Sequence, residues 1–270
     1  MSKIVLVTAA STGLGAMTAL ALAGAGHTVY AGFGPAGGVS PADLTVWGSQ
    51  VLPQELPQDA GLHPLGLDIA DQHSVSAAVE EIARRSGRVD AVVHALGPVP
   101  RGPVESFTPY QLAQIYDAHV LSSQRVNRAV LPAMRERRDG LLIWVVPSRH
   151  RADATPYLAL HEEAVTVIDH LAESYARELA GFGIEVCTVM CGSPTADIGR
   201  QSSLVRPDDA ETFAAYDARY RGLVDSVDAA LAEQAAGEAD IARTAEAIVG
   251  VVNNPKGSRG QRVTIGAPPR

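Results

Sequence analysis

Residues 3–15 read Lys-Ile-Val-Leu-Val-Thr-Ala-Ala-Ser-Thr-Gly-Leu-Gly, and this part of the sequence is the most informative about the fold. Its first six residues form a short, mostly apolar and β-branched run, which is typical of a strand buried on both faces of a parallel sheet. Small residues follow, and from Gly13 to Gly24 the apolar side chains recur at helical spacing. A strand, a tight turn and a helix in this order predict the first unit of an α/β sheet.

The same alternation continues along the chain. We expect further strands at 27–31, 65–68, 89–94, 141–146, 184–190 and 262–265, and further helices at 74–85, 108–131, 157–179 and 241–251. The segment between the second and third strands is rich in Gly, Pro, Ser and Gln, and it predicts a long loop. Strands that alternate with helices predict right-handed crossovers. The expected fold class is therefore α/β: a single Rossmann-like domain over residues 1–270, with a doubly wound parallel sheet of about seven strands and helices on both faces.

Composition and charge exclude several classes of protein. Hydrophobic residues make up 46% of the chain and charged residues 19%, which excludes a disordered protein. The 22 basic and 30 acidic residues give a net charge of −8, and no basic run is longer than Arg-Arg, so we expect no nucleic-acid partner. No apolar stretch approaches the ~20 residues that span a bilayer, and no signal-peptide pattern occurs, so we expect no membrane partner and a cytoplasmic location. The two cysteines, Cys187 and Cys191, indicate neither a disulfide framework nor a metal site.

The order of motifs resembles the short-chain dehydrogenase/reductase family over nearly the whole chain. Thr8-Ala-Ala-Ser-Thr-Gly-Leu-Gly15 is similar to the family's glycine-rich turn, and Asp68 stands where the family has an Asp that contacts adenine. Ser148 follows the fifth strand at the position of the catalytic serine, and Ala176-Arg-Glu-Leu179 resembles the end of the catalytic helix. The resemblance implies a Rossmann-like fold, a small-molecule substrate and a variable substrate lid at about residues 193–240.

The resemblance also implies that the two long helices form an oligomer interface. Both helices carry apolar positions around their circumference, and those of the second include Leu158, Leu160, Val167 and Leu171. We therefore expect a homodimer or homotetramer built on an isologous two-fold contact.

The dinucleotide-binding segment departs from the family pattern. The resemblance implies that Gly13, Gly15 and Asp68 would bind a dinucleotide, if one binds. However, Ala9 stands where the family has its first glycine, and residues 32–35, Gly-Phe-Gly-Pro, carry no charge that would select NAD or NADP. We therefore expect that no cofactor is required, with NADP as the alternative.

The family's catalytic tetrad is Asn, Ser, Tyr and Lys, and this chain replaces three of its four members. Ser148 is retained, and because the family spaces its serine and tyrosine by thirteen residues, the tyrosine position is His161 rather than Tyr157. The lysine position, four residues further on, is Val165, and the asparagine position is His119. The catalytic candidates are therefore His161, Ser148 and His119.

The loss of the lysine position decides the expected chemistry. Only two of the basic residues are lysines, and both lie near the ends of the chain. Val165 can neither hold a ribose nor lower the pKa of a phenol, so we expect standard hydride transfer to be disabled. Histidine exchanges protons near neutral pH, so His161 beside the Ser148 hydroxyl suits general acid–base catalysis. The alternative for His161 is a histidine that survives without a role in an inactive pocket.

Two further features admit a functional interpretation. Arg149, His150 and Arg151 follow Ser148 on a loop and could bind an anionic group, although a solvated face is favoured. Cys191, at the end of a strand, could act as a nucleophile, but without an adjacent base a small buried residue is favoured.

Together these features predict a non-redox enzyme on this scaffold: a cyclase, lyase or isomerase that acts on a small molecule by acid–base catalysis, in bacterial secondary metabolism. The first alternative is an atypical NADP(H)-dependent oxidoreductase in which His161 donates the proton. The second alternative is a catalytically inactive partner or ligand-binding protein of the same fold. Cofactor titration discriminates between the first two hypotheses.

Overall fold

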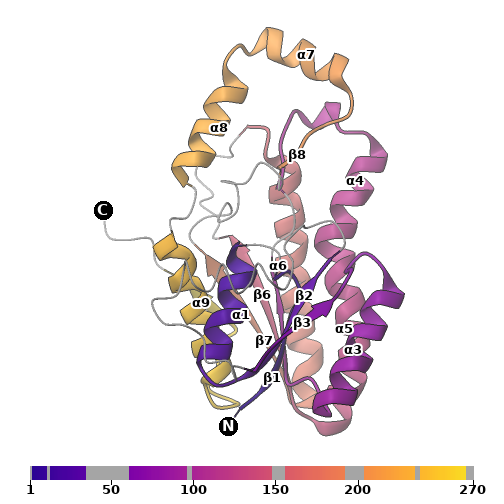
Figure 1. Ribbon diagram of the computed structural model, residues 1–270. Helices are drawn as coiled ribbons and strands as arrows, with labels where there is room; N and C mark the ends of the chain where they lie inside the picture. The colour runs from indigo at the N-terminus through magenta and orange to yellow at the C-terminus, as the bar shows by residue number, and fades with distance from the viewer. Residues whose placement is uncertain are drawn as a thin grey trace.

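A computed structural model describes residues 2–10, 13–34, 61–95, 99–147, 156–191, 204–234 and 238–265. Seven strands form one parallel sheet in the order β3-β2-β1-β4-β6-β7-β9 (Figure 1). The strands are β1 (Ile4–Val7), β2 (Thr28–Phe33), β3 (Leu62–Gly66), β4 (Ala91–His94), β6 (Gly140–Pro147), β7 (Ile184–Cys191) and β9 (Arg262–Thr264). The prediction of a parallel sheet of about seven strands is confirmed.

Helices cover both faces of this sheet. One face packs against α1 (Gly13–Gly24) and α9 (Glu238–Asn253), which contact each other along their length. The other face packs against α3 (Gln72–Ser86), α5 (Ser122–Arg137) and α6 (Ala159–Leu179). The central strands are therefore buried on both sides, and all eight residues of β6 are buried. This explains why the central strands are continuous apolar runs in the sequence.

The strand order reverses direction between β1 and β4. The chain runs outward from β1 through β2 to β3 and then crosses back to β4 on the other side of β1. Such a switch point opens a crevice at the carboxyl ends of the strands, where ligands of open α/β sheets bind. α1 begins at Gly13, directly after β1, so its amino terminus faces this crevice.

One predicted helix, 108–131, is divided in the structure. It consists of α4 (Pro109–Tyr116), a π-helical turn at Asp117–Leu121 and α5, which continues to Arg137. Thr108 caps α4 through a capping box, in which its hydroxyl accepts from the Gln111 amide at 3.2 Å. Apolar periodicity cannot show a single π turn, because the extra residue shifts the helix face by only part of a turn.

The third strand also differs from its prediction. The sequence predicts a strand at 65–68, and β3 lies at Leu62–Gly66 with Pro64 inside it. Proline cannot donate a ladder hydrogen bond, but β3 is an edge strand that pairs only with β2, so Pro64 is tolerated.

Short elements lie above the carboxyl edge of the sheet (Figure 1). β5 (Val99–Pro100) pairs in parallel with β8 (Leu204–Val205), and a 3-10 turn follows at Val104–Ser106. α7 (Ala210–Arg219) and α8 (Leu223–Gln234) then form an arch over this edge. These helices lie within residues 193–240, the segment in which the sequence resemblance implies a variable substrate lid. The small second sheet has no signal in the sequence, because each of its strands has two residues.

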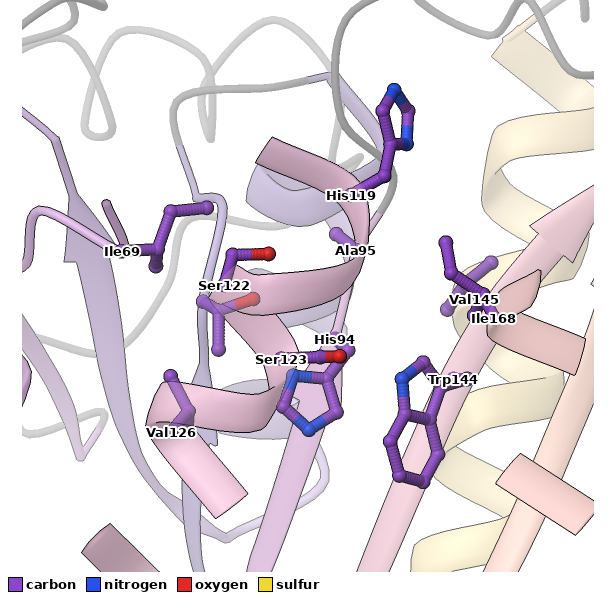
Figure 2. Close-up of a pocket in the computed structure, with 11 residues that line it drawn as sticks. Ile69, His94, Ala95, His119, Ser122, Ser123, Val126, Trp144, Val145 and Ile168 are labelled. Atoms are coloured by element: carbon purple, nitrogen blue, oxygen red, sulfur yellow. The ribbon is translucent and has the colours of Figure 1, made fainter. Parts of the chain in front are cut away.

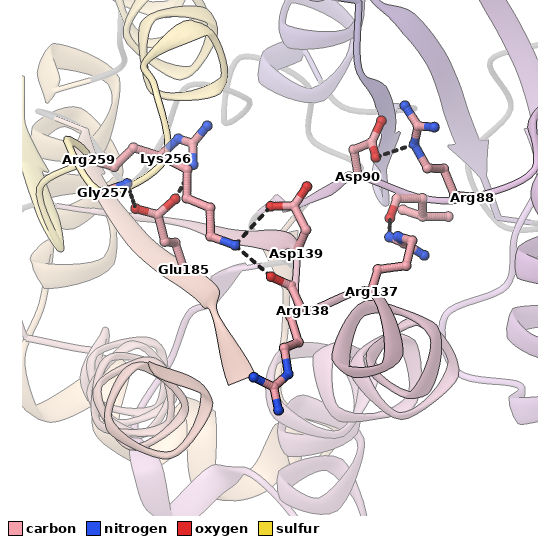
Figure 3. A network of polar contacts seen from close by, with 10 residues as sticks. Arg88, Asp90, Arg137, Arg138, Asp139, Glu185, Lys256, Gly257 and Arg259 are labelled. Carbon is pink, nitrogen blue, oxygen red and sulfur yellow. Dashed lines mark hydrogen bonds and ion pairs between the residues drawn. The ribbon is translucent and has the colours of Figure 1, made fainter. Parts of the chain in front are cut away.

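The opposite edge carries a polar network (Figure 3). The Lys256 ammonium donates to the Arg138 carbonyl at 2.6 Å and pairs with Asp139 at 3.3 Å. The Glu185 carboxylate accepts from the Gly257 amide at 2.8 Å and pairs with Arg259. These residues lie at the amino-terminal ends of β6 and β7 and tie them to the segment before β9. No helix in the described part of the chain is long and apolar enough to cross a bilayer.

Candidate active site

Two histidines from different helices meet at the carboxyl edge of the sheet. His119 lies in the π turn between α4 and α5, and His161 lies in the first turn of α6. Their ring centroids are 6.0 Å apart and the rings meet edge to face at 69°. Both side chains are almost excluded from solvent, at 4% and 3% exposure. The structure thus brings together two of the three predicted catalytic residues, and π turns are frequent at functional sites.

Burial determines the charge state of this pair. Desolvation, together with the positive charge that His119 can carry, lowers the pKa of His161 to about 3. His161 is therefore a neutral imidazole at neutral pH. Neither of its ring nitrogens has a hydrogen-bond partner among the described residues. An unpartnered buried imidazole is costly in a purely structural position, so a ligand is expected to contact His161.

A small cavity with a mixed polar and apolar lining lies beside His119, where side chains of β4, β6 and α5 meet (Figure 2). Its volume is about 20 Å³, which is room for about one water molecule. Figure 2 shows side chains from α5 and from two strands around this space. The lining residues are Thr8, Ile69, His94, Ala95, His119, Ser122, Ser123, Val126, Trp144, Val145 and Ile168.

His94 forms the floor of this cavity and is held rigidly. One ring nitrogen is 2.9 Å from the Asn127 side-chain oxygen, and the ring stacks on Trp144 with centroids 4.8 Å apart. Burial lowers the pKa of His94 to about 4, so it is also neutral at neutral pH. These contacts give His94 a structural role.

A second group of polar atoms lies under α8, and the sequence analysis did not identify it. Arg101 follows β5, has 4% of its side chain exposed and pairs with Asp228 of α8 at 2.6 Å. The Gly102 amide donates to the Tyr157 carbonyl at 3.0 Å, so the two segments are adjacent. An arginine in a loop rich in glycine and proline looks like a solvated residue in the sequence, which explains why Arg101 was missed.

Tyr157 lies just before α6, outside the helix. Its φ of 67° is in the left-handed region, which is rare for a tyrosine and marks a strained position. Its hydroxyl is buried and has no partner among the described residues. Burial and the nearby Asp217 and Tyr220 raise the pKa of the Tyr157 phenol. Because Tyr157 precedes the helix, it does not share a helix face with His161, as a tyrosine and lysine one turn apart would.

Other predicted site residues have separate positions. Ser148, with Arg149, His150 and Arg151, lies outside the described residues. Cys191 ends β7 and is buried, and its thiol donates to the Val146 carbonyl at 3.4 Å.

The turn after β1 fits the pyrophosphate of a dinucleotide. The Ala10 amide donates to the Gly32 carbonyl at 2.9 Å, which fixes the turn against β2. Ala9 does not have a positive φ, so the alanine in place of glycine causes no backbone strain. Gly13 and Gly15 are buried in the first turn of α1, whose positive dipole end favours a phosphate.

Asp68 lies just after β3, at the end of the crevice where an adenine would sit. Its carboxylate accepts from the Ala70 amide at 2.9 Å, which fixes the carboxylate at the surface of this loop. The predicted cofactor residues therefore surround the β2–β1 side of the crevice.

No lysine among the described residues takes the place of the family's catalytic lysine. Val165 is 3% exposed, and the two lysines lie at the opposite edge, before β1 and before β9. Val165 borders an open cavity of about 310 Å³ at the carboxyl ends of β6 and β7, which neither His119 nor His161 lines. The lining residues are Val146, Pro147, Val165, Asp169, His170, Met190 and Arg262.

Comparison with known proteins adds a family and named relatives. The family model described as short chain dehydrogenase matches residues 3–204. A 3-ketodihydrosphingosine reductase from Bacteroides thetaiotaomicron is 28% identical over 190 residues; the match covers 70% of this chain and 63%, less than two thirds, of the reductase. A cyclopentanol dehydrogenase from a Comamonas species is also 28% identical, over 70% of this chain and 72% of its own.

A solved structure shows the same fold over its full length. An alcohol dehydrogenase from the archaeon Thermococcus sibiricus, complexed with 5-hydroxy-NADP, has a TM-score of 0.72 and covers 100% of both chains. At 18% identity this likeness concerns the fold alone.

These comparisons correct two expectations from the sequence. The expected non-redox cyclase, lyase or isomerase is wrong, because the matching family and the relatives above are dehydrogenases and reductases, and their names do not support a place in secondary metabolism. The expectation that no cofactor is required is wrong for the same reason, since a dehydrogenase needs a hydride acceptor, and the matching fold is solved with an NADP derivative. The loss of the lysine does not exclude hydride transfer. In the family the lysine positions a ribose and lowers the pKa of a phenol, but it is neither the hydride carrier nor the proton donor.

Proposed function

Because the chain belongs to the short-chain dehydrogenase family, we propose that it is an NAD(P)-dependent oxidoreductase that interconverts an alcohol and a carbonyl on a small molecule. The observation that carries this proposal is the buried pair of His119 and His161 at the carboxyl edge of the sheet. His161 stands where the family has its proton-exchanging tyrosine. We assign the proton exchange to its imidazole.

The cofactor would supply or accept the hydride when it is bound. In the proposal, Gly13 and Gly15 hold its pyrophosphate at the start of α1, and Asp68 contacts its adenosine end. Gly32 and Phe33 at the end of β2 and Gly34 after it carry no charge that would select NAD or NADP, so NADPH and NADH are tested separately.

His161 acts on the oxygen of the substrate. Burial keeps its imidazole neutral at neutral pH, so one ring nitrogen has a lone pair for the proton of an alcohol, and its low pKa of about 3 makes it a weaker base than an exposed imidazole. The alcohol thus loses its proton to His161 while its carbon loses a hydride, and a carbonyl results. In the reverse direction the carbonyl oxygen regains the proton. His119 is the nearest second titratable group, and Ser148 would hydrogen-bond the same oxygen.

The test is a matched pair of variants on α6. His161→Phe removes the imidazole, and His170→Phe changes an exposed histidine on the same helix. Turnover is followed by the absorbance of the reduced nicotinamide with a panel of ketones and secondary alcohols. We expect His161→Phe to lower kcat by about 10² or more and His170→Phe to leave it unchanged. Equal kcat in His161→Phe and the wild type would contradict the assignment of the proton exchange.

Three broader features belong to the proposal. We propose that residues 193–240 form the substrate lid, which the arch of α7 and α8 over the carboxyl edge supports. We also propose a homodimer or homotetramer and a cytoplasmic location. Leu158 and Leu160 cannot contribute to the oligomer contact, because both are buried in the monomer core at 5% exposure. Val167 and Leu171 stay partly exposed on α6, so the case for the contact now rests on them.

A further inference from the structure

Arg101 is a buried cation that the fold alone leaves incompletely satisfied. Only 4% of its side chain is exposed, and within the described part of the chain it pairs with Asp228, whose own side chain is 42% exposed. This pair engages Nη1 of the guanidinium. Its Nε is buried and has no hydrogen-bond partner among the described residues. A buried N–H donor without an acceptor is rare in native proteins and points to a ligand that supplies one.

Tyr157, whose backbone lies beside that of Gly102, carries a second buried polar group without a partner among the described residues. The Gly102 amide donates to the Tyr157 carbonyl, so the backbones of residues 101–102 and 157 lie next to each other. The Tyr157 hydroxyl is buried without a partner among the described residues, and the backbone of Tyr157 is held in the left-handed region. Strained residues that the surrounding structure maintains cluster at ligand sites.

The two groups are close to the proposed catalytic histidine along the chain. Tyr157 lies four residues before His161, and Leu158 between them packs with Val99 of β5 and Val227 of α8. Arg101 and Tyr157 therefore stand between the arch and the first turn of α6. In this type of fold the residues that bind the 2′-phosphate of NADP follow β2. Arg101 follows β5, so we assign it to the substrate and not to the adenosine end of the cofactor.

We propose that Arg101 and Tyr157 form a recognition site for an anionic oxygen group, a carboxylate or a phosphate, on the substrate of the proposed oxidoreductase. Both unsatisfied groups can donate, so the group they bind must accept. Guanidinium favours carboxylate and phosphate, which it can bind through two N–H groups. The ion pair with Asp228 shows that the Arg101 guanidinium can bind a carboxylate here. On substrate binding the anion takes the place of Asp228 beside Arg101, so the charge of Arg101 stays balanced, and the 42% exposed side chain of Asp228 turns to solvent.

The site can be tested separately from turnover, although the substrate assignment rests on the proposed function. Binding of benzoate, phenyl phosphate, inorganic phosphate and neutral benzamide is measured by calorimetry on the full chain. The variants are Asp228→Asn, Arg101→Met and Tyr157→Phe, with His170→Phe as the control. Asp228→Asn removes the internal competitor without removing Arg101, so it separates recognition from a purely structural ion pair.

We expect at least one of the anions to bind, about tenfold more tightly to Asp228→Asn than to the wild type, and benzamide not to bind. Arg101→Met should abolish the binding and Tyr157→Phe should weaken it. The benzoate and phosphate arms identify which anion the site takes. Failure of every anion to bind Asp228→Asn, or equal binding to Arg101→Met and the wild type, would overturn the inference. NADPH and NADH titrations of the same samples show separately whether the proposed oxidoreductase function stands.

Discussion

His119 and His161 face each other edge to face at 6.0 Å, one from a π turn and one from the first turn of α6, and both are buried. A charge on either ring disfavours a charge on the other, because water is largely excluded from the space between them. The two rings therefore resist carrying a positive charge at the same time, which favours the neutral form of His161.

The pKa of His161 should respond to its neighbour. His119→Asn restores the residue type of the family and removes the repulsive charge, so the pKa of His161 should rise from about 3 toward its ordinary value. Burial remains the larger cause, and the rise should be partial. The measurement is a pH titration of the His161 ring resonances by NMR in both proteins. An unchanged or lower pKa of His161 in His119→Asn would show that the two rings are not coupled.

The free energy of unfolding should fall in acid because of the buried histidines. The folded-state pKa values of His94 and His161 are about 4 and about 3, below the ~6.5 of an unfolded chain. Between pH 6.5 and pH 4 the unfolded chain therefore binds more protons, and stability decreases as the pH falls. Each histidine should cost on the order of 3 kcal/mol by pH 4.

Urea unfolding at a series of pH values checks this contribution. His161→Phe removes one of the two groups, so its stability should fall less steeply between pH 6.5 and pH 4 than that of the wild type. His170→Phe, on the exposed side of the same helix, should follow the wild type. Identical slopes for His161→Phe and the wild type would mean that His161 titrates normally in the folded protein.

The variant His161→Tyr returns the family's residue without its lysine. A phenol with a pKa near 10, and with Val165 in place of a lysine that would lower it, is a poor base at neutral pH. We expect kcat for alcohol oxidation to fall by about 10² at neutral pH and to rise again as the pH approaches 10. The pH dependence of kcat measures this. Wild-type kcat at neutral pH would show that a lysine is not needed to activate a phenol in this pocket.

The sheet could be predicted from the sequence because its strands are buried on both faces. The residues of β1, β4, β6 and β7 are nearly all apolar, and their helices carry clear periodicity. The edge strand β3, with Pro64 and a polar neighbour at His63, has a weaker signal and was placed three residues too late. A strand that is buried on both faces shows a clear apolar pattern in the sequence. An edge strand is less buried, so its pattern is weaker.

The meeting of His119 and His161 could also be predicted, but only through the family's spacing, since 42 residues separate them in the chain. The π turn that presents His119 leaves no trace in the apolar pattern. The Arg101–Asp228 pair could not be predicted, because it depends on how α8 returns over β5. Sequence reasoning also misjudged the chemistry, because the absence of one side chain does not show which other group takes over its role.

Calorimetric titration of NADPH and of NADH into the purified chain tests whether it binds a nicotinamide cofactor. We expect saturable binding of at least one of them, one molecule per chain, with a Kd below about 100 µM, which is about 5.5 kcal/mol. The Gly13→Asp variant, which places a negative charge at the start of α1, should abolish that binding, because it repels the pyrophosphate. Absence of saturable binding by both nucleotides up to about 1 mM, or equal binding to Gly13→Asp, would show that the chain does not bind the cofactor at α1.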